Sequence, residues 1–292
     1  MGDRFHLASH RMSTGKKLRG WLWNALLASR SLRRRLAYHL LYRYPADLDA
    51  RVPLGEGLSS PLFDQEFGAS FAEIFLHQEY APMLEAIGTP RRWIDLGCYA
   101  GFFSLWLEWQ RRRRGERAPS QALLVDANAS MEDWIRRLIA MNGLESNWNF
   151  LRSAIAEGRG ECEFVERSYM GSSLGGLDKT PGLHTRVPVL DEDELFRIFP
   201  PPYDLLKADI EGAEYELLLH YRRLIEQSRC LCLEWHSWHA GRGSLTQIRE
   251  IAEKLGLRMA EELQPARVLP SGDQTGVLLF VNPRFSDQHA VA

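Results

Sequence analysis

The chain has 292 residues, of which 45% are hydrophobic and 25% charged, a composition typical of a globular protein. No stretch approaches the roughly 20 apolar residues of a membrane-spanning helix, and four cysteines are too few for a disulfide framework, so we expect a cytoplasmic protein with reduced thiols. The net charge of −2 is unevenly spread. Residues 1–50 carry ten Lys or Arg against three Asp, a net +7, which leaves −9 for the remainder.

Residues 1–68 are predicted to form a basic helical extension followed by a linker, and residues 69–292 the main domain. Between Lys16 and Arg43, leucine and tryptophan alternate with arginine in a pattern typical of a basic amphipathic helix or helix pair. Two interpretations stand side by side. The helix attaches the protein peripherally to an acidic membrane surface or a protein partner, or it covers the domain with a solvated basic face. Nothing in this stretch favours nucleic acid as a partner. Residues 45–68 are rich in Pro, Gly, Asp and Ser and are interpreted as the linker.

The main domain begins with a helical pattern over Ser70–Ile87, with a break or kink expected at Pro82 and an end at Gly88. Short apolar runs and amphipathic segments then alternate, which favours a mainly parallel sheet with helices on both faces. Such a sheet binds ligands at the carboxyl ends of its strands. Strands are expected at Trp93–Leu96, Ala122–Val125, Asn149–Leu151, Glu161–Val165, Asp204–Ala208, Cys230–Trp235, Arg258–Leu263 and Val277–Val281. Helices are expected after Gly101 and at Met131–Met141, Asp191–Phe199, Ala213–Ile225 and Leu245–Leu255.

A glycine turn follows the first of these strands. Gly97 and Gly101 separate the strand from a segment whose apolar residues recur at helical spacing, which is how a Rossmann-like fold presents a nucleotide site beside a helix N-terminus. The dinucleotide pattern G-x-G-x-x-G is absent, because Tyr99 stands where its second glycine would be. Asp126 ends the next strand, 25 residues after Gly101. An acid there can accept hydrogen bonds from both ribose hydroxyls, although a turn or N-cap role is the simpler alternative.

Acidic residues also follow two later strands. Asp209, Glu211 and Glu214 come directly after one buried strand, and Glu234 and His236 end the next. Stabilisation of a helix dipole would explain some of these acids, but three together exceed what a cap needs. A histidine at the ligand edge can remove a proton from an acceptor hydroxyl.

These motifs resemble the FkbM-type S-adenosylmethionine-dependent methyltransferases. The most specific part is Lys-Ala-Asp-Ile-Glu-Gly-Ala-Glu over Lys207–Glu214, and Glu234-Trp-His236 matches as well. The first motif departs from the family pattern, because Cys98-Tyr99-Ala100 replaces Ala-Asn-x and Asp126-Ala-Asn128 replaces Glu-Pro-Asn; the acid and both glycines are kept. The resemblance spans roughly Gln78–Pro283 and implies a Rossmann-like class I methyltransferase fold, with a mainly parallel seven-stranded sheet.

The resemblance also implies roles for individual residues. The cofactor would be S-adenosylmethionine, with Asp126 on the ribose and an acceptor facing the acidic edge. A divalent metal on Asp209 and Glu234 is compatible with related enzymes. The residues implied for the cofactor are Asp95, Gly97, Tyr99, Gly101, Asp126, Asn128, Ser153 and Ile155, and those implied for catalysis are Asp209, Glu211 and His236.

The sequence therefore predicts an S-adenosylmethionine-dependent methyltransferase that acts on a hydroxyl of a sugar, glycan or secondary metabolite. Two alternatives remain open. An NAD-dependent dehydrogenase would use a similar fold but needs the closer glycine spacing that is absent. A non-catalytic methyltransferase-fold binding module would be expected to lose the acidic cluster, which is present.

Overall fold

A computed structural model describes residues 29–43, 50–63, 65–166, 173–174, 182–237, 244–269 and 272–285. The chain divides into two compact units, Met1–Arg51 and Val52–Ala292. In the first unit, helix α2 (Arg30–Arg43) begins after Ser29, whose side-chain oxygen accepts a hydrogen bond from the backbone N–H of Leu32 at 3.3 Å. The helix expected in this region is thus confirmed over α2, and residues 16–28 lie outside the described residues. The domain boundary at residue 68 stays a prediction.

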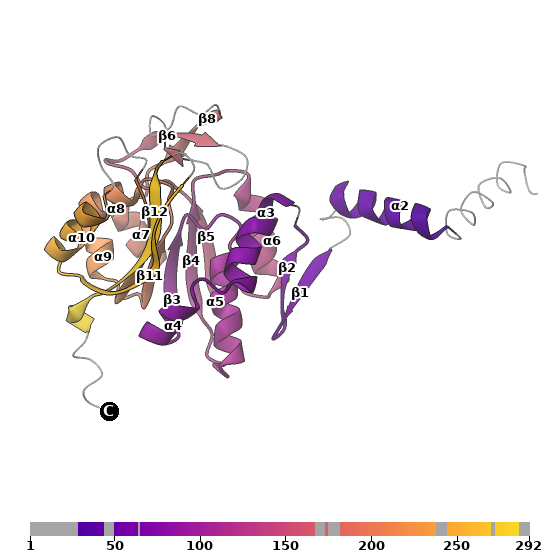
Figure 1. Cartoon of the computed structure of the whole chain (residues 1–292), viewed down its shortest axis with the longest axis horizontal. Coiled ribbons are helices and arrows are strands. Elements are labelled where there is room, and N and C mark those ends of the chain that lie inside the picture. The colour runs from indigo at the N-terminus through magenta and orange to yellow at the C-terminus, as the bar shows by residue number, and fades with distance from the viewer. Residues whose placement is uncertain are drawn as a thin grey trace, which may run out of the picture. The chain divides into compact units, whose positions relative to one another are not determined.

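The second unit is built on a seven-stranded sheet with the order β11-β12-β10-β9-β3-β4-β5 (Figure 1). β12 runs antiparallel to both of its neighbours, and the pairs β10–β9, β9–β3, β3–β4 and β4–β5 are parallel. The predicted mainly parallel, Rossmann-like sheet is confirmed. The strands are β3 (Arg92–Leu96), β4 (Gln121–Asp126), β5 (Trp148–Arg152), β9 (Leu205–Ala208), β10 (Cys230–His236), β11 (Arg258–Val268) and β12 (Gln274–Val281).

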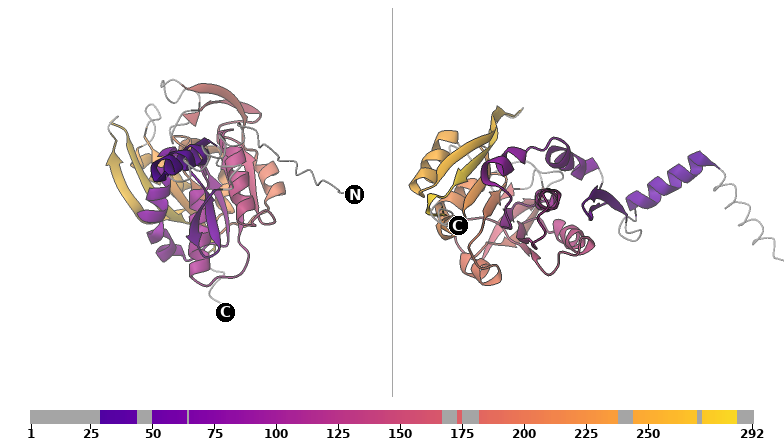
Figure 2. Two further views of the ribbon diagram at one scale, coloured as in Figure 1. Left: turned by 90° about the vertical axis from the view of Figure 1, so that its right-hand side faces the viewer. Right: turned by 90° about the horizontal axis from the view of Figure 1, so that it is seen from below.

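Helices cover both faces of this sheet, as the views in Figures 1 and 2 show. Successive residues of a strand point to opposite faces, so Trp93 packs with one helical layer and Ile94 with the other. Because both faces are buried, the central strands are almost continuously apolar. The first layer contains α4 (Ala81–Ile87), α5 (Phe102–Arg113) and α6 (Met131–Met141). The second contains α7 (Glu192–Ile198), α8 (Glu214–His220), α9 (Arg222–Glu226) and α10 (Leu245–Lys254).

Two predicted helices are interrupted. The pattern over 70–87 forms α3 (Gln65–Phe71), the π-helix η1 (Ala72–Leu76) and α4, with the break before Pro82. The expected interruption at Pro82 is confirmed as a break and not as a kink, because this proline lies in the first turn of the new helix α4, where its missing N–H costs nothing. The helix predicted over 213–225 is divided at Tyr221 into α8 and α9.

The predicted linker contains a β-hairpin instead. β1 (Arg51–Gly55) and β2 (Leu58–Pro61) are joined by Glu56 and Gly57, both at positive φ, which is the geometry of a two-residue hairpin turn. The side-chain amide of Asn142 holds β2 by exchanging two hydrogen bonds of 2.8 Å with the backbone of Ser59. A Gly- and Pro-rich composition is as typical of such a turn as of a linker, which explains the error.

A small antiparallel sheet forms a second structure within this unit. Its order is β7-β6-β8, from β6 (Glu161–Glu166), β7 (Ser173–Leu174) and β8 (Leu183–Pro188). In Figure 1 it lies beyond one end of the central strands. Separately, within the described residues no helix combines the length and apolar character that crossing a bilayer requires.

Candidate functional site

The glycine turn after β3 is fixed by a very close approach of two chain segments. Gly97 has φ +68°, and a Cβ atom placed on it would lie 1.7 Å from the carbonyl oxygen of Asp209. Only glycine therefore fits there. The N–H groups of Gly97 and Cys98 both donate to the carbonyl of Val125, at 2.9 and 3.1 Å. The turn is thus held against the ends of β9 and β4, which are the neighbours of β3 in the sheet.

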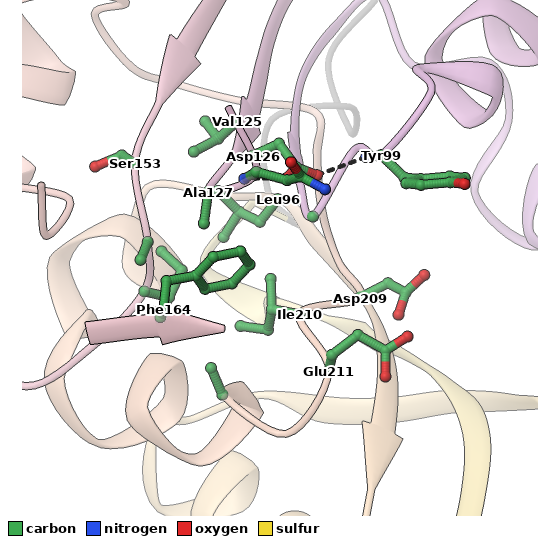
Figure 3. A pocket seen from close by; sticks show the side chains of 15 residues that line it. Leu96, Tyr99, Val125, Asp126, Ala127, Ser153, Phe164, Asp209, Ile210 and Glu211 are labelled. Atoms are coloured by element: carbon green, nitrogen blue, oxygen red, sulfur yellow. Dashed lines mark hydrogen bonds between the residues drawn. The ribbon is translucent and has the colours of Figure 1, made fainter. Parts of the chain in front are cut away.

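Asp126 braces this turn from the end of β4. One carboxylate oxygen accepts the backbone N–H of Tyr99 at 2.7 Å, and the other accepts that of Asn128 at 2.8 Å. Removal from water raises the pKa of Asp126 to about 6, although the two N–H donors oppose the shift. The carboxylate is therefore held in one orientation, facing the space in front of the turn (Figure 3).

Asp95 supports the turn from behind. Its side chain is fully buried, accepts a hydrogen bond from the Ser104 hydroxyl at 2.8 Å and lies 3.4 Å from the ammonium of Lys207. Lys207 is also buried, 3.3 Å from the Gly97 carbonyl oxygen and 3.5 Å from Asp209. Burial lowers the pKa of Lys207, but the carboxylates of Asp209 and Asp95 outweigh it and raise the pKa, so the ammonium stays charged.

A cavity lies in front of the turn, at the carboxyl ends of the parallel strands. Of the residues predicted to bind a cofactor, Gly97, Tyr99, Asp126, Asn128, Ser153 and Ile155 line it. Asp95 and Gly101 are not among its lining residues, so the structure gives these two a supporting position beneath the cavity instead of a direct contact. Gly101 has φ +72° at the start of α5, a conformation that glycine adopts readily.

The walls of the cavity are mainly apolar, as ligand pockets usually are. Phe164 reaches it from β6, and Figure 3 shows its ring facing the side chain of Ile210. The hydroxyl of Ser153 donates to the Pro188 carbonyl at 2.9 Å and points away from Asp126. Phe164 and Ile210 were missed in the sequence analysis, since no motif there indicated that β6 would fold over the strand ends. The apolar lining residues include Leu96, Val125, Ala127, Ile155, Phe164 and Ile210.

Acidic side chains form one edge of the cavity. Asp209 and Glu211 both line it, and their carboxyl groups lie near each other in Figure 3. Glu211 has φ +52°, a left-handed conformation unusual for a residue with a side chain. Glu214 stabilises this loop from within, because its Oε1 accepts the N–H groups of Ile210 and Gly212 at 3.3 and 3.1 Å. The conformation of the loop therefore depends on a carboxylate that is itself fully buried.

The same Glu214 orients His236. Nδ1 of His236 lies 3.1 Å from Glu214 Oε1, and Nε2 lies 4.0 Å from Glu211 Oε2. Burial lowers the pKa of His236, but the Glu214 and Glu211 carboxylates raise it to about 10 overall. β10 pairs with β9, so the structure confirms that the two acidic strand ends are neighbours. His236 and Glu234 lie beside Asp209 and Glu211 and are not among the residues that line the cavity.

Asp209, Glu234 and His236 form a group that suits a divalent cation. One ligand atom from each lies within 4.8 Å of the others. His236 has the orienting carboxylate partner that metal-binding histidines usually have, and the geometry with Glu214 leaves Nε2 as the ligand. Burial and the neighbouring Asp209 carboxylate raise the pKa of Glu234 to about 8. A bound cation would offset the electrostatic repulsion between neighbouring carboxylates of this kind.

Two further side chains bind carboxylates near the acidic edge, from elements that no sequence motif connected with it. Tyr80, just before α4, donates from its hydroxyl to Glu234 Oε2 at 3.4 Å. Gln264, on β11, donates to the carboxylate of the adjoining Glu79 at 2.8 Å. Burial raises the pKa of Glu79, and the Glu73 and Asp209 carboxylates add to the shift. The turn between η1 and α4 and the strand β11 therefore lie near the group formed by Asp209 and Glu234.

Comparison with known proteins gives only remote likenesses. No protein-family model matches the chain, and no curated protein does. Among solved structures, the chain is similar to an O-methyltransferase from Bacillus cereus in complex with S-adenosylhomocysteine, with a TM-score of 0.42 and 12% identity, covering 85% of this chain and 97% of that one. It is also similar to the O-methyltransferase TomG of Streptomyces achromogenes, involved in tomaymycin synthesis and bound to S-adenosylmethionine, with a TM-score of 0.41 and 10% identity, covering 76% of this chain and 91% of that one.

Proposed function

We propose that this chain is an S-adenosylmethionine-dependent methyltransferase of the FkbM type, which methylates a hydroxyl of a sugar, glycan or secondary metabolite. The observation that carries the proposal is a single cavity. It brings the carboxylate at the end of β4 (Asp126) and the glycine turn together with the acidic edge at the end of β9 (Asp209 and Glu211). The sequence motif over Lys207–Glu214 forms this edge, and that motif is the most specific part of the resemblance.

The cavity offers a suitable partner for each part of the cofactor. A carboxylate has about four acceptor sites, so Asp126 can accept ribose hydroxyls in addition to its two backbone N–H donors. Ile155, Phe164 and Ile210 supply apolar surface for the adenine ring. S-Adenosylmethionine, when bound, supplies a sulfonium methyl group for in-line displacement. The protein then has to align the acceptor with that methyl group and exclude water.

The acidic edge would hold the acceptor. The carboxylates of Asp209 and Glu211 can accept the proton of an acceptor hydroxyl, and His236, oriented by Glu214, reinforces the same edge. Asp209 and Glu211, the side chains of this edge that line the cavity, are both acidic, so we expect a neutral or cationic acceptor in preference to a phosphate or carboxylate compound. A sugar hydroxyl meets this condition.

We further propose that a divalent cation, where the reaction uses one, is held by Asp209, Glu234 and His236. The test is a thermal-shift titration of the purified protein with Mg²⁺, Mn²⁺ and Zn²⁺. We expect a metal-dependent rise in Tm that Asp209→Asn abolishes. The matched control is Glu157→Gln, which alters the more exposed group formed by Glu157, Glu216 and His220. A rise that survives Asp209→Asn, or that disappears in the control, would place the cation elsewhere.

The first experiment on the function is calorimetric titration with S-adenosylmethionine, S-adenosylhomocysteine and NAD. We expect micromolar binding of the first two and none of NAD. Binding of NAD alone would favour the dehydrogenase alternative and refute the proposal. Transfer of a labelled methyl group from S-adenosylmethionine to a panel of sugars and glycans then identifies the acceptor. Cofactor binding with no transfer to any hydroxyl compound would favour the binding-module alternative.

A further inference from the structure

Helix α2 carries charge of one sign only. Its sequence, RSLRRRLAYHLLYR, contains five arginines and no acidic residue. The arginines at positions 30, 33, 34, 35 and 43 are all exposed. Like charges one turn apart repel one another and destabilise an isolated helix. An arrangement of this kind therefore gains stability from an anionic partner.

Apolar side chains of α2 are exposed beside these arginines. Leu32, Leu36 and Leu40 recur every four residues and share one side of the helix. Leu32 is 45% exposed, and Tyr38, on another side, is 62% exposed. An anionic partner with an apolar layer beneath its charged surface would bind both kinds of side chain.

The charge of the whole chain is divided between its two units. Residues 1–51 carry a net +8, which leaves −10 for residues 52–292. An anionic surface would therefore attract the first unit and repel the second. By net charge, attraction to such a surface is expected from the N-terminal segment and not from the unit that contains the cavity.

We propose that α2 binds the surface of an anionic lipid bilayer and attaches the protein peripherally to it. Clusters of four to eight basic residues are typical of segments that bind anionic lipid. Arginine side chains can extend their charged ends to the headgroups while leucine and tyrosine enter the boundary of the acyl chains. Lipid is favoured over nucleic acid because a phosphate backbone would bind the arginines and leave the exposed side chains of Leu32 and Tyr38 in water.

The test is co-sedimentation of the full-length protein with vesicles, which requires no enzymatic turnover. The vesicles contain phosphatidylcholine alone or phosphatidylcholine with about one-third phosphatidylserine. The variant Arg30→Gln/Arg34→Gln/Arg35→Gln removes three charges from α2, and glutamine retains helix propensity. The matched control Arg113→Gln/Arg114→Gln/Arg117→Gln removes three exposed charges from the second unit. Circular dichroism and thermal melting show whether each variant remains folded.

We expect the wild-type protein to sediment with the anionic vesicles only and to be released at 1 M salt. Each basic residue near such a surface contributes roughly fivefold to the partition coefficient, so the α2 variant should bind on the order of 100-fold more weakly. The control should bind like the wild type. Leu32→Ser should also weaken binding, which separates a bilayer from a purely ionic partner.

Three outcomes would overturn the proposal. The first is that the wild-type protein does not sediment with anionic vesicles. The second is an equal loss of binding in the control variant, because the attraction would then not reside in α2. The third is tighter binding of a 20-base-pair DNA duplex than of the vesicles at the same salt concentration, which would identify nucleic acid as the partner.

Discussion

Gly97 is the position where the structure permits the sharpest test of the site. A methyl group on residue 97 would lie 1.7 Å from the Asp209 carbonyl oxygen and 2.7 Å from its carbonyl carbon, both backbone atoms that cannot rotate away. To bring the first distance to the 3.0 Å minimum, the ends of β3 and β9 would have to separate. The 3.1 Å hydrogen bond from the N–H of Asp209 to the Leu96 carbonyl would then be stretched or broken.

The expected cost of Gly97→Ala has two parts. An L-residue in the left-handed region costs about 1–2 kcal/mol, and forcing a methyl group into a filled space adds about 1–3 kcal/mol. The free energy of unfolding should therefore fall by about 2–5 kcal/mol. Because the turn also carries the N–H of Tyr99 that binds Asp126, affinity for S-adenosylmethionine should fall as well.

Gly143 provides a matched control. Its φ is +64°, close to the +68° of Gly97, but a Cβ atom on it would meet nothing within 4 Å. Gly143→Ala should cost only the conformational part, about 1–2 kcal/mol, and leave cofactor affinity unchanged. The reduced freedom of the unfolded chain is the same in both variants and cancels. Urea denaturation measures the two stabilities. Equal losses would show that the approach of Gly97 to Asp209 is not as tight as described.

The remaining predictions concern the cavity and the loop beside it. The pKa of Asp126 is raised to about 6, and the proposed function assigns its ionised form to the ribose. The Kd for S-adenosylmethionine should therefore rise as pH falls through about 6, and Asp126→Asn should remove this dependence in calorimetry between pH 5 and 8. The same raised pKa means that the contribution of Asp126 to stability is fully present below about pH 4 and is lost as pH rises through about 6. Glu214→Ala should lower the free energy of unfolding by about 3–5 kcal/mol, because it removes the acceptor of the buried His236 Nδ1 and of the N–H groups of Ile210 and Gly212. Glu214→Gln retains an acceptor oxygen and should cost less, and equal losses in urea would contradict this. Phe164→Ala should weaken cofactor binding roughly tenfold, whereas Val187→Ala, in the same apolar cluster but outside the cavity, should not.

The part of the site that the sequence revealed lies at strand ends. Gly97, Asp126, Asp209 and Glu234 each follow a short apolar run, and in a parallel sheet the ends of neighbouring strands meet at one edge. Their location at one edge of the sheet could therefore be predicted, whereas the pairing of β9 with β3 and β10 could not be read from chain order. Asp95 could not be placed in the same way. It lies within a strand that is buried on both faces. Such a strand has no alternation of polar and apolar residues that would indicate to which face of the sheet a given side chain points.

Residues that reach the site from outside this pattern were missed for a different reason. Glu79 and Tyr80 lie in a turn whose position is fixed by Gln78, because its side chain accepts a hydrogen bond from Gln110 at 2.8 Å. Gln264 approaches from β11, which joins the sheet through the antiparallel strand β12. Phe164 belongs to β6 of the small sheet and reaches the cavity from there. These contacts depend on how separate elements pack together, which periodicity within one segment does not encode.

The place of β9 in the sheet has a consequence for how the protein is made. β9 lies between β3 and β10, and its pairing with β3 joins residues more than 100 positions apart, such as Trp93 and Leu205. Contacts of such long sequence separation form slowly, because the entropy of closing a large loop is lost before the strand pairing contributes any stabilising energy. Both Gly97 and Asp209 line the cavity, so a nascent chain that ends before β9 lacks the wall formed by Asp209, Ile210, Glu211 and Ala213. The ability to bind the proposed cofactor would thus arise late in synthesis, at the step that completes the centre of the sheet.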